Sequence, residues 1–154
     1  MDAKNSYSEF QLIGHRIREI QLRSNLIDYA ETEQIEKRLD VRYEINSLEV
    51  EDDFITAILS LAINISMVEN EQSIFDGDII FEGCFRAPTS MEQSAFKNML
   101  AIHGCASLYS VARGAISNIS SQIFYNGKIL LPLVNFVRFN EIKEDVEQKE
   151  VPLT

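Results

Sequence analysis

The sequence lacks the features that mark several common classes of protein. It has two cysteines, Cys84 and Cys105, which are too few for a disulfide framework and show no metal-ligand spacing. We expect both to be small buried apolar residues. No apolar run approaches the ~20 residues that span a bilayer, and no basic segment followed by an apolar one opens the chain. The sequence therefore predicts a cytoplasmic protein that is not inserted in a membrane.

Basic residues are also scarce. The 154 residues contain 14 lysines and arginines against 24 acidic residues, so the formal net charge is -10. Much of this charge is concentrated between residues 28 and 53. A surplus of negative charge opposes binding to a phosphate backbone, so we do not expect a nucleic-acid partner.

Catalytic signatures are missing as well, including nucleophile elbows, zinc-protease helices, phosphate-binding loops and dinucleotide fingerprints. The two histidines are His15 and His103, and the second lies near Cys105. Residues two apart on a helix point away from one another, which argues against a Cys-His nucleophile pair. We predict no catalytic residue, no metal and no cofactor. A small-ligand or acyl-handling enzyme, using His15 or a carboxylate, is the alternative of another class.

Alternating apolar residues are abundant in the first part of the chain. Three runs, at about residues 39–45, 55–67 and 75–85, alternate apolar with polar residues as half-buried strands do. A fourth run, at about residues 9–23, requires a β-bulge, because Ile17 has the opposite parity to Leu12 and Ile20; Gly14 is one candidate position.

Two helices with an apolar connection follow the strands. One helix carries a stripe of apolar residues and ends at Asn126-Gly127, and the apolar residues 129–134 separate it from a second helix capped by Asn135. A shorter helix with a capping box from Ser90 to Gln93 precedes them. This order predicts an α+β fold: one domain, 1–154, with a four-stranded antiparallel sheet over about 9–88 and helices on one face over about 90–146.

The end of the chain resembles the SecB family of cytosolic export chaperones. The family has a YAREx(I/V)(S/T) helix, an apolar loop and a PVNF motif, and the matching stretches here are Val111-Ala112-Arg113-Gly114-Ala115-Ile116-Ser117 and Val134-Asn135-Phe136. The start of the first strand, Phe10-Gln11-Leu12, is loosely similar too. The resemblance implies a SecB-like sheet and helices, and a chaperone that binds unfolded or export-bound polypeptides in an apolar groove and keeps them translocation-competent.

From this resemblance we expect particular residues to line the client groove. They are Phe85, Phe124, Tyr125, Ile129, Leu130, Leu131, Leu133 and Val134. The strand residues Leu39, Val41 and Tyr43 are further candidates, although core packing is the favoured interpretation for these three. Apolar contact has little directionality, so such a groove would accept many client sequences.

The resemblance also implies a homotetramer, a dimer of dimers, and docking to the motor protein SecA. We assign Leu108, Val111, Ala115 and Ile119 to the oligomer interface, and Asp78 to motor docking. The sequence departs from the family at Gly114, where Glu is usual, and at Leu133, where Pro is usual. A SecB-like chaperone dedicated to one client, such as an antitoxin, is therefore the second hypothesis, and a general oligomeric interaction protein is the third.

Overall fold

The computed structural model describes residues 9–25 and 35–149, with side chains up to residue 144. In this part of the chain the strands are β1 (Gln11–Ser24), β2 (Glu36–Val50), β3 (Phe54–Glu69) and β4 (Gln72–Pro88). The helical segments are α1 (Gln93–Met99), the π-helical turn η2 (Leu100–Gly104), α2 (Cys105–Ile123) and α3 (Phe136–Lys149). The predicted α+β fold is confirmed. The single-domain assignment stays a prediction, because its ends lie outside the described residues.

The four strands form one antiparallel sheet in the order β1-β4-β3-β2. The first strand therefore lies beside the last one, and β1 and β2 are the two edges. Consecutive hairpins join β2 to β3 and β3 to β4. At the second hairpin Asn70 and Glu71 both have positive φ angles, 49° and 65°, as a tight turn between twisted strands requires.

Alternation along the central strands separates a dry face from a polar face. Side chains such as Leu59, Leu61 and Phe81 point toward the helices and are at most 1% exposed. Their neighbours Ser60 and Glu82 point to the opposite face, where Ser60 donates a hydrogen bond to Glu82. Successive side chains of a strand face opposite sides, so the sequence pattern fixes which residues form the core.

The predicted bulge in β1 is confirmed, and a second one accompanies it. The pairing of β1 with β4 shifts between Leu12 and Gly14 and again between Ile17 and Glu19. Each shift adds one residue to β1, so the first moves Ile17 to the helix side and the second returns Ile20 to that side. The two bulges together explain the parity of the apolar residues in this strand.

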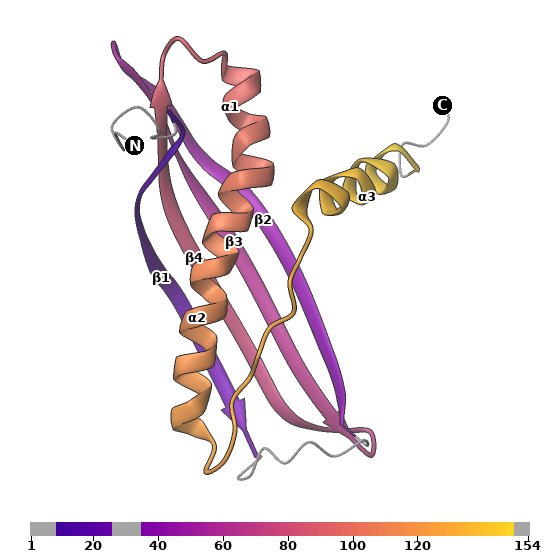
Figure 1. Ribbon diagram of the computed structural model, residues 1–154. Coiled ribbons are helices and arrows are strands. Elements are labelled where there is room, and N and C mark those ends of the chain that lie inside the picture. Colours follow the sequence, from indigo (N-terminus) through magenta and orange to yellow (C-terminus); the bar gives the residue numbers. More distant parts are fainter. Residues whose placement is uncertain (1–8, 26–34, 150–154) are drawn as a thin grey trace, which may run out of the picture.

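One nearly continuous helix, α1 to α2, lies across the dry face of the sheet (Figure 1). Close approach is possible because Gly83 has no side chain; a Cβ atom there would lie 3.3 Å from Leu108 of α2. The predicted capping box is wrong, since the helix begins after Glu92 without a side-chain cap. The helix continues past Gly104, because the π-helical turn leads into α2.

Candidate binding surface

Residues 124–135, which join α2 to α3, form an extended segment that we call the strap. It returns along α2 and crosses the helix-bearing face of the sheet between α2 and β2 (Figure 1). Gly127 makes the reversal at its start with a φ of 86°, a conformation that favours glycine. At its end the Asn135 carboxamide oxygen accepts hydrogen bonds from the amides of Val137 and Arg138, at 3.1 and 3.3 Å, which confirms the predicted cap of α3.

Three side chains of α2 hold the strap by its backbone. The Ser120 hydroxyl accepts a hydrogen bond from the Ile129 amide at 2.8 Å. Arg113 Nε donates to the Leu131 carbonyl at 3.0 Å, and the Tyr109 hydroxyl donates to the Pro132 carbonyl at 2.9 Å.

These three α2 residues are spaced by four and seven positions, so they lie on one side of the helix. Burial raises the pKa of Tyr109 and keeps its hydroxyl a donor. The sequence contained this spacing, but it gave no sign of what the three side chains contact.

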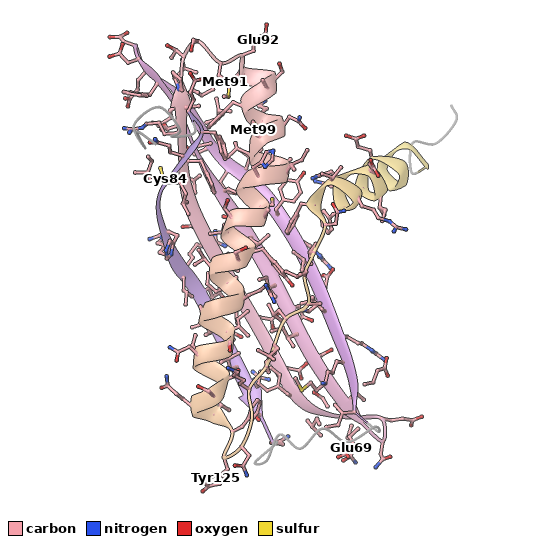
Figure 2. The ribbon with its side chains drawn as sticks, in the orientation of Figure 1. Glu69, Cys84, Met91, Glu92, Met99 and Tyr125 are labelled. Atoms are coloured by element: carbon pink, nitrogen blue, oxygen red, sulfur yellow. The ribbon has the colours of Figure 1, made fainter. Side chains whose placement is uncertain are left out.

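The strap alternates buried and exposed side chains because its backbone is extended. Ile129 and Leu131 are 4% and 5% exposed, whereas Leu130 and Leu133 are 70% and 83% exposed. The exposed apolar side chains of this region form what we call the apolar row: Tyr125, Leu130, Leu133, Val137 and Ile142. Figure 2 shows Tyr125 at the outer end of the turn that begins the strap. A contiguous patch of exposed apolar side chains commonly marks a site of interaction, and these five side chains follow one another in the sequence along the strap and α3.

The structure divides the predicted groove residues into two groups. Phe85, Phe124, Ile129 and Leu131 belong to the hydrophobic core. Their side chains are at most 5% exposed, so they do not line an open surface of the described chain, and their assignment to a client groove stays a prediction. The residues that remain at the surface are Tyr125, Leu130 and Leu133, with Val134 half-buried. Sequence reasoning missed Val137 and Ile142, which continue the row onto α3.

Of the additional strand candidates, Tyr43 lies against α3. Val41 is buried in the core, as favoured, and Leu39 and Tyr43 are half-buried against it. The Tyr43 ring lies 6.2 Å from the Phe139 ring, and its hydroxyl donates a hydrogen bond to the Asn140 carboxamide.

Asn140 also connects α3 to the long helix. Its Nδ2 donates to the carbonyl of Ala101 in η2 at 2.9 Å. A π-helical turn interrupts the regular backbone hydrogen-bond pattern of an α-helix and is frequently found at functional sites. The side chain of Asn140 thereby joins three elements, α3, η2 and β2, and fixes where the strap ends.

The predicted interface residues do not share one environment. Leu108 is fully buried against the sheet, so it has no surface left for a second copy. Val111, Ala115 and Ile119 are half-buried on the flank of α2 and stay candidates. Gly114 is exposed, and a Cβ atom there would meet nothing within 4 Å, so close packing inside this chain does not explain this glycine.

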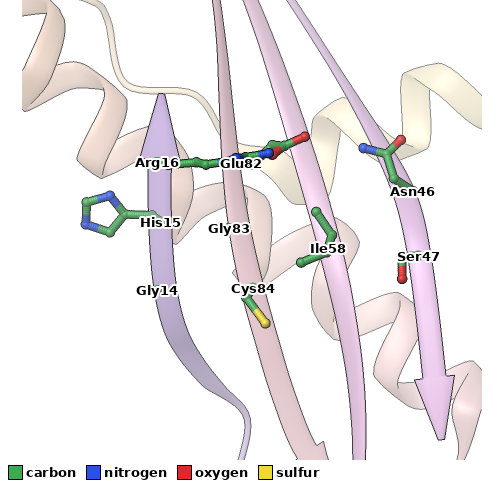
Figure 3. Close-up of a pocket in the computed structure, with 9 residues that line it drawn as sticks. All are labelled: Gly14, His15, Arg16, Asn46, Ser47, Ile58, Glu82, Gly83 and Cys84. Carbon is green, nitrogen blue, oxygen red and sulfur yellow. The ribbon is translucent and has the colours of Figure 1, made fainter. Parts of the chain in front are cut away.

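The polar face of the sheet carries Asp78 and a hollow of about 450 Å³. Asp78 is exposed and accepts a hydrogen bond from Asn64 Nδ2 at 2.8 Å. In the hollow, the Glu82 carboxylate is bound by Arg16 at 2.7 Å (Figure 3). Arg18 also binds this carboxylate, at 3.1 Å. The hydrogen bond from Arg16 lowers the pKa of Glu82. A carboxylate held ionised in this way is a poor general acid or base near neutral pH.

The geometry gives no support to nucleophilic catalysis. Cys105 is buried, and burial raises the pKa of its thiol to about 12, while His103 is exposed. The His15 side chain points away from the hollow in Figure 3. Among the described residues no group of three or more His, Cys, Asp or Glu side chains could hold a metal ion. No helix in the same part of the chain has the length and apolar character needed to cross a membrane.

Comparison with known proteins supports the fold through structure and not through sequence. No protein-family model matches the chain, and no curated protein matches its sequence. Among solved structures, a SecB-like chaperone of Mycobacterium tuberculosis, in complex with a ChAD peptide from the HigA1 antitoxin, aligns with a TM-score of 0.59 at 12% identity. The alignment covers 81% of this chain and 90% of that one. A protein of unknown function from Streptococcus agalactiae aligns over 80% of this chain and 96% of its own, with a TM-score of 0.47 at 8% identity. The fold of this chain is therefore SecB-like.

Proposed function

We propose that this protein is a chaperone that binds unfolded polypeptide segments through the apolar row on the strap and the start of α3. The observation that carries the proposal is the exposure of Leu130 and Leu133, at 70% and 83%, on a segment whose backbone is fixed by Ser120, Arg113 and Tyr109. An apolar surface on a fixed backbone binds without first losing its own conformational freedom.

The charge of the chain is compatible with such a surface. A formal net charge of -10 opposes nonspecific aggregation of the protein through this apolar surface. The same charge favours client segments that carry basic residues beside their apolar ones. Apolar contact at roughly 25 cal/mol per Å² then supplies affinity without demanding one sequence.

For the client we favour a dedicated partner, such as an antitoxin, over general export. The SecB-like chaperone that shares this fold was solved with an antitoxin peptide, and that observation motivates the choice. Keeping exported preproteins translocation-competent is the second candidate. It would use Asp78, on the polar face, to dock SecA, and this acid is exposed as such a contact requires.

Assembly into a homotetramer, a dimer of dimers, belongs to the same proposal. Val111, Ala115 and Ile119, half-buried on one flank of α2, are the residues we assign to the interface. A tetramer would present several copies of the apolar row to one client and raise the effective concentration of binding sites. Light scattering at micromolar concentration tests this part; a monomer would contradict it.

An aggregation assay tests the client-binding surface. We expect the protein to delay the aggregation of a chemically unfolded test protein, and Leu133→Asp to weaken this protection about tenfold, because each apolar side chain contributes on the order of 1.5 kcal/mol when buried. Leu130→Asp should act similarly. The matched control is Val50→Asp, which alters a side chain that is 63% exposed at the end of β2, outside the apolar row.

Circular dichroism should show that all three variants keep the fold, because the changed side chains are exposed. Equal protection by Leu133→Asp and by the unchanged protein would contradict the assignment of the apolar row. Failure of the unchanged protein to delay aggregation would contradict the chaperone proposal itself.

A further inference from the structure

The hollow on the polar face of the sheet is built by all four strands. Its floor is a row of residues that lie opposite one another across the sheet. Gly14 of β1 is opposite Cys84 of β4, and Ile58 of β3 lies between Cys84 and Ser47 of β2. Figure 3 shows Cys84 and Ile58 at the centre of this row. The volume of about 450 Å³ is within the range of sites that bind small molecules.

A β-bulge borders the hollow at each edge of the sheet. The register of β1 shifts between Leu12 and Gly14, and that of β2 shifts between Ile45 and Ser47. The extra residue of β2 is Asn46, whose Nδ2 donates a hydrogen bond to the Ser60 hydroxyl on the polar face. Bulges redirect side chains and are over-represented beside functional sites. Two irregularities on opposite edges thus converge on one hollow.

Gly14 leaves the floor of the hollow open at β1. Its φ angle is not positive, and a Cβ atom there would meet nothing within 4 Å. Neither the backbone conformation nor packing among the described residues therefore requires a glycine at this position. Glycine weakens the interior of a strand and often marks a place where a ligand approaches the backbone closely. The effect of Gly14 that remains is the space it leaves above the sheet.

The wall of the hollow at β1 carries a surplus of positive charge. Arg16 and Arg18 both bind the single carboxylate of Glu82, so two guanidinium groups face one negative charge. This surplus is local, because the whole chain has a formal net charge of -10. The Arg16 side chain is 70% exposed, which leaves part of its guanidinium group open to a second acceptor. A planar guanidinium group matches the geometry of a carboxylate.

The opposite end of the hollow is polar and uncharged. Asn46 and Ser47 line it, and the Ser47 hydroxyl makes no hydrogen bond with another residue of the described chain. Between the two ends the floor is formed by the side chains of Ile58 and Cys84. The hollow therefore offers a cation at one end, an apolar surface in the middle and a hydroxyl group at the other end.

We propose that the hollow binds a small organic acid. The carboxylate of the ligand accepts hydrogen bonds from Arg16, its flat apolar body lies over Ile58 and Cys84, and its far end reaches Ser47. One negative charge on the ligand matches the one surplus positive charge of the wall. This site is on the face of the sheet opposite to the helices and the apolar row, so the inference goes beyond the proposed chaperone function and does not depend on it.

Naphthoate is the probe, and naphthamide, which has the same shape without the charge, is its matched control. Binding is followed by nuclear magnetic resonance of the isotopically labelled full chain. We expect naphthoate to shift the amide signals of Gly14, Ser47 and Cys84 and to bind at least fivefold more tightly than naphthamide. Naphthoate binding only as weakly as naphthamide would overturn the role of the guanidinium group.

The thiol of Cys84 gives a second measurement at the same site. Cys84 is half-buried, whereas Cys105 is buried and has a pKa raised to about 12, so iodoacetamide should react at Cys84. Saturating naphthoate should slow alkylation of Cys84 at least threefold, as measured by mass spectrometry. An unchanged rate would show that the probe does not cover the floor of the hollow and would overturn the proposal.

Two pairs of protein variants locate the site. Gly14→Met fills the floor and should weaken naphthoate binding at least tenfold, whereas Gly114→Met, at an exposed glycine of α2, should change it by less than twofold. Arg16→Gln should lower the affinity for naphthoate to that for naphthamide. Arg23→Gln makes the same change of charge on the same strand, opposite Asp76 and outside the hollow, and should change affinity by less than twofold.

Circular dichroism checks that each variant keeps the fold, and Gly14→Ala, a smaller change, should weaken binding in the same direction as Gly14→Met. The same affinity in Gly14→Met and Gly114→Met would overturn the location of the site. So would amide shifts confined to the strap around Leu133. Absence of naphthoate binding at millimolar concentration would overturn the proposal as a whole.

Discussion

Ser120→Ala should loosen the strap from α2. The hydroxyl of Ser120 is the acceptor for the amide of Ile129, and both residues are nearly inaccessible, at 2% and 4% exposure. Alanine leaves this amide buried without a partner, which costs about 1–3 kcal/mol. Alanine also favours the helix by about 0.5 kcal/mol over serine, which offsets part of the loss.

The net effect should be a destabilisation of about 1.5 kcal/mol, since the lost partner outweighs the gain in helix propensity. For a chain of this size, that corresponds to a fall in Tm of about 3–6 °C. Thermal and urea unfolding, followed by circular dichroism at one fixed protein concentration, measure the change. Hydrogen exchange of the Ile129 amide should accelerate as well, because the hydrogen bond that protects it is lost.

The control for this experiment is the neighbouring serine. Ser121 is exposed, and its hydroxyl donates to the Asn118 carbonyl at 2.7 Å, so Ser121→Ala removes no partner from a buried group. We expect this variant to be neutral or slightly stabilised. The same Tm for Ser120→Ala and Ser121→Ala would refute the reasoning that a single side chain of α2 fixes the start of the strap.

Two further predictions concern charge and helix packing. Because Arg16 lowers the pKa of folded Glu82, this group stabilises the fold above the unfolded pKa of about 4.3 and loses the effect as pH falls through its folded pKa. The free energies of unfolding of the unchanged protein and of Glu82→Gln, measured across pH, should therefore approach each other as the pH falls. If they move apart instead, the ion pairs of Glu82 do not stabilise the fold. Gly114→Ala should raise the free energy of unfolding of the monomeric chain, measured in urea, by about 1 kcal/mol. Alanine favours a helix over glycine, and its Cβ atom would meet no other atom within 4 Å. Destabilisation there would show that the glycine is required within the chain.

The sheet illustrates how far local pattern determines structure. The alternation in β3 and β4 predicted which side chains enter the core, because successive residues of a strand must face opposite sides. The parity change at Ile17 predicted a bulge for the same reason, and the structure adds a second one after Ile17. What the pattern did not contain was the strand order, since the pairing of β1 with β4 depends on contacts between distant segments.

The strap shows the limit more clearly. Its apolar residues were recognised as a group, but Leu131 is in the core and Leu133 is at the surface, at 5% and 83% exposure. An extended run that is apolar at nearly every position shows no alternation, so its sequence does not indicate which side chains face the core. The contacts with Arg113, Tyr109 and Ser120 choose that side, and they depend on how the strap lies against α2.

The sequence by itself determined the elements of this protein: strands whose parity marks the core, a helix that ends near Asn126 and Gly127, and the Asn135 cap of α3. Those features depend on residues close in the chain, and the physical forces behind them act locally. Only the tertiary structure decided the strand order, the residues of the apolar row and which strands of the described sheet lie at its edges. Each of these depends on which surfaces remain uncovered after packing, and burial is a property of the whole fold.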